Sequence, residues 1–140
     1  MLYKCFKLDD FLRKTYSDED LTYYLIAGIT HDVNHPGTNN IYEVKMKSEL
    51  AKVAENDAVL EKMHLQTFLN ICKSKPEFDI ISKSSNPQKT KEKITRAILA
   101  TDMAKHFKNL EKIQKHREQK TLNFGEDYKD STYRIIQQMM

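Results

Sequence analysis

The stretch Thr30-His31-Asp32-Val33-Asn34-His35-Pro36-Gly37-Thr38-Asn39-Asn40 is the most informative part of the sequence. It follows residues 21–29, whose apolar side chains recur at the spacing of an amphipathic helix. The neighbouring imidazole of His31 and carboxylate of Asp32 suit a borderline metal such as zinc or iron, and the carboxylate can also bridge to magnesium or manganese. The stretch therefore predicts a metal site at the polar end of an apolar helix.

The predicted helix begins after Ser17, a good N-cap that is followed by three acidic residues in the first turn. Continued at the same spacing, its apolar stripe reaches Asp32 and His35. Pro36-Gly37 is predicted to end the helix. This periodicity places His35 one turn after His31 on the same face. A bare His-Asp pair more often caps a helix or satisfies a polar partner. The longer string H-D-x-x-H-P-G-x-x-N has few chance occurrences and favours the metal site.

Other parts of the chain also favour helices, since only three glycines and three prolines occur. We expect an all-α, compact domain of about 6–8 helices. Asn56-Asp57 is predicted to break one helix and cap the next, and residues 74–88 form a loop with a turn near 78–81. The remaining expected elements are helices at 8–14, at 48–55, at 57–71, from 88 to beyond 107 and from 127 onward, with a loop at 121–126. The predicted inner face of the helix at 57–71 carries Leu60, His64, Thr67, Phe68 and Ile71. That of the helix beginning at 88 carries Ile94, Ala97, Ile98, Thr101 and Asp102.

Charge and composition argue against several classes of protein, among them nucleic-acid-binding and membrane-spanning proteins. The net charge is only +3, from 23 basic and 20 acidic residues, which argues against nucleic acid as a partner. The densest basic stretch, residues 105–120, is typical of a solvated helix face. No apolar run is long enough to span a membrane. Cys5 and Cys72 show no metal-binding spacing, so we expect reduced thiols in a cytoplasmic chain, with a disulfide between them left open.

The string around His31 closely resembles the signature of the class I cyclic nucleotide phosphodiesterases of the HD superfamily. Val59-Leu60-Glu61-Lys62-Met63-His64 is similar to their V-L-E-x-H-H segment, and Ala100-Thr101-Asp102-Met103-Ala104-Lys105-His106 to their A-T-D-M-x-x-H segment. Tyr133-Arg134-Ile135-Ile136-Gln137-Gln138-Met139-Met140 resembles the helix that leads to their next metal-binding aspartate. The resemblance implies an HD-type helical domain and hydrolysis of cAMP or cGMP to the nucleoside 5′-monophosphate.

The resemblance also implies residue roles. His31 would ligate the tightly bound metal, usually zinc, and Asp32 would bind that metal and the second one, usually magnesium or manganese. His35 and Glu61 would act in catalysis by hydrogen-bonding the waters around the second metal. The residues that would support these groups or lie near the pocket are Asn40, His64, Thr101, Asp102 and Met103. Taken alone, Glu61 would be a surface acid, His64 a core histidine and Met103 a core residue, whereas Asp102 on an apolar face needs a partner.

The sequence departs from the family pattern at several points. Asn34 stands where many members carry an acid, and Met63 stands where they carry the first histidine of a pair. Nothing before Ser17 matches the H-N-x-x-H segment, which supplies the general acid and one metal ligand. The family's last metal-binding aspartate and its purine-binding glutamine are also not among residues 1–140 and are expected further along a complete domain. We therefore interpret residues 1–140 as the central portion of a catalytic domain, with no general acid and too few ligands for tight zinc binding.

Three functional hypotheses follow. The first is that the chain is part of an active phosphodiesterase, in which two metals activate a bridging water for in-line attack on phosphorus while a histidine protonates the leaving 3′ oxygen. The second is a catalytically inactive helical module that binds other protein subunits. The third, which the long match disfavours, is an HD domain with another substrate, such as a nucleotidase.

Overall fold

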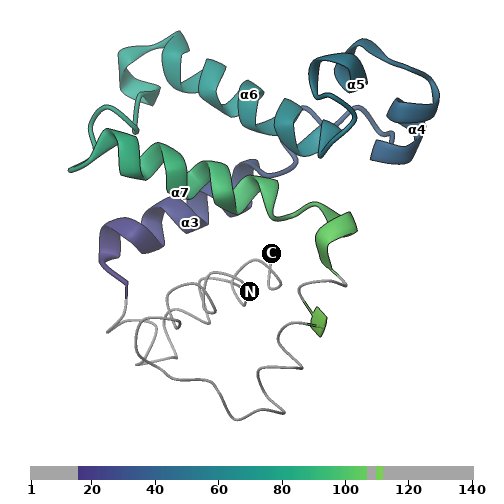
Figure 1. Ribbon diagram of the computed structural model, residues 1–140. Coiled ribbons are helices and arrows are strands. Elements are labelled where there is room, and N and C mark those ends of the chain that lie inside the picture. Colours follow the sequence, from purple (N-terminus) through teal and green to yellow (C-terminus); the bar gives the residue numbers. More distant parts are fainter. Residues whose placement is uncertain (1–15, 107–109, 112–140) are drawn as a thin grey trace.

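The computed structural model describes residues 16–106 and 110–111, and these form helices, turns and loops without a strand (Figure 1). The helices are α3 (Asp18–Thr30), α4 (Asn40–Lys45), α5 (Glu49–Val53), α6 (Val59–Ser74), a 3-10 turn (Pro76–Phe78) and α7 (Pro87–Leu99). The all-α prediction is confirmed. Several predicted features lie outside the described residues: the helix at 8–14, Cys5, most of the basic stretch 105–120, the loop 121–126, the helix from 127 and the motif at 133–140.

Helix α3 begins as predicted and ends earlier than predicted. Ser17 Oγ accepts a hydrogen bond from Asp20 N at 3.1 Å, and Asp20 reaches back to Ser17 N. The helix ends at Thr30, with His31 as C-cap and Asn34 in the left-handed region at a φ of 61°. Pro36 disfavours a helical conformation for His35, so the chain has to leave the helix before it. The prediction that His31 and His35 share a helix face is therefore wrong.

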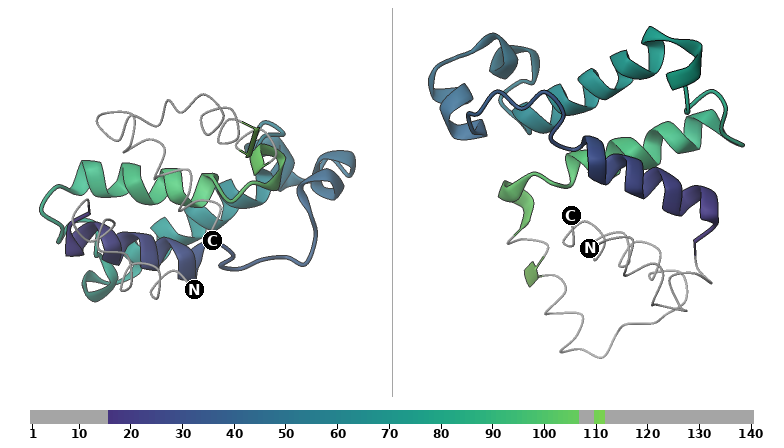
Figure 2. Two further views of the ribbon diagram at one scale, coloured as in Figure 1. Left: turned by 90° about the horizontal axis from the view of Figure 1, so that it is seen from below. Right: turned by 180° about the vertical axis from the view of Figure 1, so that it is seen from behind.

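The core lies between α3, α6 and α7. Helices α3 and α7 run side by side and α6 packs against both (Figures 1 and 2). The fully buried side chains include Tyr24, Ile94 and Ile98. On α6 the predicted inner face is correct at three positions, while Ile71 is exposed and Cys72 is buried in its place. The inner row follows Leu60, His64, Phe68 and Cys72, since every fourth residue returns to the same face.

Helices α4 and α5 form a small arm at the start of α6, shown beside it in Figure 2. The helix predicted at 48–55 is present as α5, and Ser48 caps it by accepting from Ala51 N at 3.1 Å. Helix α4 was not predicted. The predicted cap at Asn56-Asp57 is wrong, because α6 follows Ala58, which is left-handed and makes no side-chain cap bond. The chain turns sharply here through Glu55 and Asn56, which also have positive φ.

Helix α7 is shorter than predicted. Asn86 caps it through Lys89 N at 3.1 Å, and the helix ends at Leu99 rather than beyond residue 107. A separate helical segment begins at residue 103. Thr101 and Asp102 therefore lie in the connection between two helical segments and not on the inner face of one long helix. In the predicted loop 74–88, a 3-10 turn lies at Pro76–Phe78 and a further turn at residues 80–83, on either side of the predicted position near 78–81. None of the helices in the described part of the chain combines the length and the apolarity that crossing a bilayer requires.

Candidate metal centre

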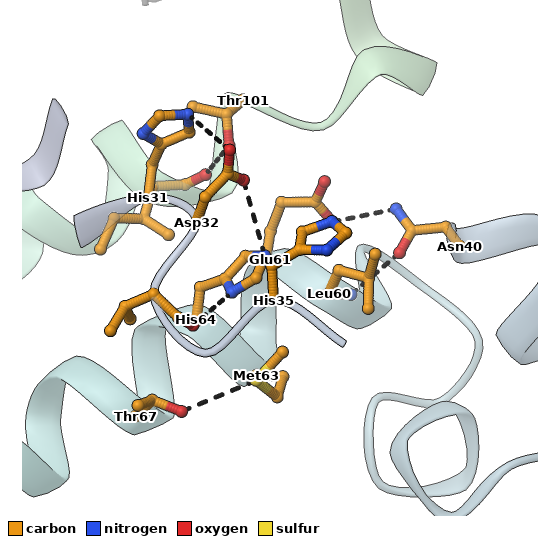
Figure 3. A network of polar contacts seen from close by, with 12 residues as sticks. His31, Asp32, His35, Asn40, Leu60, Glu61, Met63, His64, Thr67 and Thr101 are labelled. Atoms are coloured by element: carbon orange, nitrogen blue, oxygen red, sulfur yellow. Dashed lines mark hydrogen bonds and ion pairs between the residues drawn. The ribbon is translucent and has the colours of Figure 1, made fainter. Parts of the chain in front are cut away.

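The turn after α3 faces the first half of α6, and this meeting point carries the histidines (Figure 3). His31 Nδ1 lies 2.7 Å from Gly28 O. A carbonyl oxygen can only accept, so Nδ1 carries the proton and a neutral ring has its lone pair at Nε2. That Nε2 lies 3.2 Å from Asp32 Oδ2. The backbone of α3 thus fixes His31 in the form that ligates metals.

His64 has the same arrangement from the other side. Its side chain is 2% exposed, and its Nδ1 donates to Val33 O at 2.8 Å. The Nε2 atom lies 3.8 Å from Asp32 Oδ1, which is too long for a hydrogen bond. Metal-binding histidines usually donate their second ring N–H to a carbonyl or carboxylate, and both rings satisfy that condition.

The carboxylate of Asp32 is the point on which these groups converge. It is 65% exposed and presents one oxygen to each Nε2. Two lone pairs facing a carboxylate repel it unless a proton or a cation lies between them. Asp32, His35 and His64 each offer a ligand atom within 4.8 Å of the others, so together they form a group that could hold a metal ion. Imidazole nitrogen and carboxylate oxygen are a donor set that fits zinc or a harder divalent ion.

His35 belongs to this group but is held in the opposite form. Its Nδ1 accepts from Gly37 N at 3.0 Å, so a neutral ring carries its proton on Nε2. The ring stacks on His64 with centroids 5.4 Å apart. In this conformation His35 presents an N–H to the site and not a lone pair. The geometry favours hydrogen bonding to a water or a phosphate oxygen over direct ligation.

Glu61 and Asn40 are joined directly, although 21 positions separate them. Asn40 Nδ2 donates to Glu61 Oε2 at 3.0 Å, and Asn40 Oδ1 accepts from Leu60 N at 2.9 Å (Figure 3). Both side chains are partly buried. The structure thus brings together Asp32, His35 and His64 in one cluster, with His31 beside Asp32, and it joins Asn40 to Glu61 at the start of α6.

Asp102 has a local partner set. It is 4% exposed, its Oδ1 accepts from Ala104 N at 3.0 Å, and its Oδ2 lies 3.6 Å from Lys105 Nζ. Asp102 therefore caps the helical segment that begins at residue 103 and does not need a metal for its charge. Thr101 Oγ1 donates to Ile98 O at 2.7 Å, and Met103 is 66% exposed and so is not a core residue.

Two features of the surroundings were not found from the sequence. Glu43 is buried in α4, and hydrogen bonds from Ser48 and Thr38 lower its pKa, so the loop before α4 is tied to the loop after it. Nothing in the sequence around Glu43 distinguishes it from a surface acid. Met63, which replaces the expected histidine, lines a cavity of about 340 Å³ between α5 and α6 together with Leu50 and Val53.

Comparison with known proteins gives a consistent result. The chain matches the family model described as 3′5′-cyclic nucleotide phosphodiesterase over residues 1–140. It is 37% identical over 107 residues to 3′,5′-cyclic-AMP phosphodiesterase 4 of Dictyostelium discoideum, covering 71% of this chain and 10% of that protein. It is 29% identical over 131 residues to the high affinity cGMP-specific 3′,5′-cyclic phosphodiesterase 9A of Homo sapiens, covering 92% of this chain and 21% of that protein.

Among solved structures, the phosphodiesterase domain of the Salpingoeca rosetta rhodopsin phosphodiesterase matches with a TM-score of 0.74 and 27% identity. The match covers 85% of this chain and 36% of that one. The chain thus spans about a tenth to a fifth of the length of the curated relatives described above.

Proposed function

Because the chain belongs to the 3′5′-cyclic nucleotide phosphodiesterase family, we propose that it contributes the His31–Asp32 part of a two-metal site that hydrolyses 3′,5′-cyclic nucleotides to nucleoside 5′-monophosphates. The relatives named above include a cAMP and a cGMP phosphodiesterase, so the proposal specifies the substrate only as a cyclic nucleotide. We place the reaction in the cytoplasm, where the buried free thiol of Cys72 stays reduced.

One observation carries the proposal. Both imidazoles that face Asp32 donate their Nδ1 proton to a backbone carbonyl, Gly28 O at 2.7 Å and Val33 O at 2.8 Å. Their Nε2 atoms therefore flank the carboxylate as acceptors when the rings are neutral. A divalent cation removes the repulsion among these acceptors, and this is the arrangement that a metal site requires. His31 and Asp32 are proposed as ligands of zinc, with Asp32 also serving a magnesium or manganese ion.

The remaining residues would act by holding water and phosphate. When bound, the two ions would polarise the phosphate and lower the pKa of the water between them. His35 presents its Nε2–H toward the site and would donate to an oxygen there, while the Glu61 carboxylate would accept from a water. His64 would hold the Val33 carbonyl through its Nδ1–H and would place its Nε2 beside Asp32 from the buried side. Thr101, Asp102 and Met103 are proposed to lie close to the candidate metal centre.

A complete site needs groups beyond these. Two ligands are fewer than the three or four that hold zinc tightly, and the 140 residues contain no H-N-x-x-H segment to supply the general acid. We propose that the chain is the central part of a catalytic domain and that other segments provide the remaining ligands and the acid.

A second candidate function is a helical interaction module without catalysis. It is favoured by four large apolar side chains on α4, α5 and the turn between them that are at least half exposed: Ile41, Tyr42, Met46 and Val53. Exposed apolar groups that gather in this way often mark a protein contact. Such a module would bind a protein partner and would retain no metal.

The test is metal content by elemental analysis together with hydrolysis of cAMP and cGMP in added Mg²⁺ or Mn²⁺. Asp32→Asn removes the central carboxylate, and Asp57→Asn is the matched control because that carboxylate is also 65% exposed and pairs with Lys62, away from the histidines. We expect retained metal to fall at least tenfold in Asp32→Asn and to be unchanged in the control. A wild-type chain that binds no metal at millimolar Mn²⁺ and hydrolyses neither nucleotide would show that these 140 residues alone are not an enzyme, which leaves either a part of a larger catalytic domain or the interaction module.

A further inference from the structure

We propose that Asn40 is a positioning residue whose single amide group both caps α6 and orients the carboxylate of Glu61. The role of Glu61 as a group of the metal site rests on the proposed function. The cap at the start of α6 stands on the structure alone. Neither role follows from the local sequence, because Asn40 lies on a different helix.

Helix α6 lacks a cap of its own. The first N–H groups of a helix have no acceptor within it, and a side chain before the helix usually supplies one. Here the preceding residue is Ala58, which is left-handed at a φ of 44° and has no side-chain oxygen. Asn56 and Asp57 are close in sequence, yet neither makes a side-chain cap bond to α6. Asn40 Oδ1 instead accepts from Leu60 N at 2.9 Å, so the cap comes from α4.

The other end of the same amide reaches the next residue. Asn40 Nδ2 donates to Glu61 Oε2 at 3.0 Å, which leaves Oε1 to accept a second hydrogen bond. An amide is planar and carries its acceptor and its donor at a fixed angle. The position of Leu60 N therefore sets the direction from which Glu61 is held. An aspartate would provide two acceptors and an alanine none, so only an amide of this length serves both partners.

Asn40 is itself held on both sides. It is the first residue of α4, which Asn39 caps by accepting from Tyr42 N at 2.8 Å. Three positions further on, the buried Glu43 bonds Thr38, and its backbone carbonyl accepts from Ser48 N at 3.1 Å. These bonds hold the end of the loop that carries Asp32 and His35 in one position. Because Asn40 lies at that end, its hydrogen bond fixes Glu61 relative to the loop.

The experiment compares four isotopically labelled, metal-free proteins by NMR: wild type, Asn40→Asp, Asn40→Ala and the control Asn70→Asp. Asn70 lies exposed on α6, where its Oδ1 accepts from Gln66 Nε2 at 2.9 Å on the solvent side. Hydrogen exchange at Leu60 N reports the cap, and three-bond couplings of Glu61 report whether its side chain keeps one rotamer. Mn²⁺ affinity, followed by electron paramagnetic resonance, reports the metal site.

In Asn40→Ala we expect exchange at Leu60 N to become roughly fivefold faster, the fold-change typical of a lost helix cap. In Asn40→Asp exchange should stay within about twofold of wild type, because an acceptor remains. The same variant should nevertheless show averaged Glu61 rotamers and about tenfold weaker Mn²⁺ binding, the lower end of the effect of removing a supporting hydrogen bond. Asn70→Asp should match wild type in all three measurements.

A Glu61 side chain that keeps one rotamer in Asn40→Asp would overturn the positioning role, and unchanged Leu60 exchange in Asn40→Ala would overturn the cap. If the wild-type chain binds no Mn²⁺, the proposed function fails for this chain. The exchange and coupling measurements need no metal and would then decide the Asn40 inference on their own.

Discussion

His64 joins the core to the candidate site, so replacing it tests both at once. Its ring is 2% exposed and stacks on His35, and its Nδ1 is the hydrogen-bond donor to Val33 O at 2.8 Å. The variant His64→Phe keeps a planar ring of similar size and removes both nitrogens. Leaving the Val33 carbonyl without this donor should cost about 1–3 kcal/mol. The more apolar ring recovers part of that loss, so we expect a net destabilisation of about 1–2 kcal/mol.

Metal affinity should respond more strongly than stability. Loss of the ring nitrogens, one of which faces Asp32 while the other holds the Val33 carbonyl next to it, should weaken Mn²⁺ binding about 10–100-fold. Phe68→Leu is the control, because Phe68 lies one turn further along α6, is 4% exposed and belongs to the apolar core. It should destabilise the fold by a similar amount, about 1–2 kcal/mol, and leave metal binding unchanged.

Urea unfolding and Mn²⁺ titration of both variants provide the measurement. The midpoint should fall while the slope with urea stays constant, which shows that stability and not the extent of unfolding has changed. Equal metal affinity in His64→Phe and wild type would refute the placement of His64 in the site. Equal loss of affinity in both variants would mean that metal binding follows general stability and not this side chain.

Three further predictions concern the elements that position the site. Ser17→Ala removes the capping box of α3 and should cost about 1 kcal/mol in the free energy of unfolding. The control Ser74→Ala, at the C-terminal end of α6, should cost less than half of that. Hydrogen bonds from the side chain and backbone of Ser85 lower the pKa of Glu19 from 4.5 to about 2. Because the pKa is lower in the folded protein, this stabilisation is present above pH 4.5 and is lost as the pH falls toward 2. Ser85→Ala should therefore flatten the dependence of the urea midpoint on pH between 4.5 and 2, and parallel pH profiles of the variant and wild type would contradict the assignment. Gly37 has a φ of 81°, and no neighbouring atom lies within 4 Å of the position that a Cβ would take, so Gly37→Ala should cost about 1–2 kcal/mol by backbone strain alone, visible as a lower thermal midpoint without a change in the packing of α3.

The sequence predicted features whose causes are local. Ser17 caps the helix that follows it, and Asp32 lies beside His31, because each of these relations spans three residues or fewer. The contacts that build the site are not local. Asn40 reaches Leu60 and Glu61, and His64 reaches Val33, across 20 to 31 positions. No periodicity indicates such pairs, and only the packing of α4 and α6 around the turn after α3 creates them.

Helix α3 ends at Thr30 and not near His35 as predicted, and the candidate metal site depends on this early end. Had α3 continued to His35 as the apolar stripe predicts, the carbonyl of Gly28 would accept from Asp32 N, four residues on. Since the helix ends at Thr30, Gly28 O is one of the last carbonyls that need a partner, and His31 Nδ1 provides it. The carbonyl of Val33, in the turn that follows, is exposed in the same way to His64 Nδ1. Each bond leaves an Nε2 atom facing the carboxylate of Asp32, so the early end of α3 and the turn that follows it bring the rings of His31 and His64 to the same carboxylate.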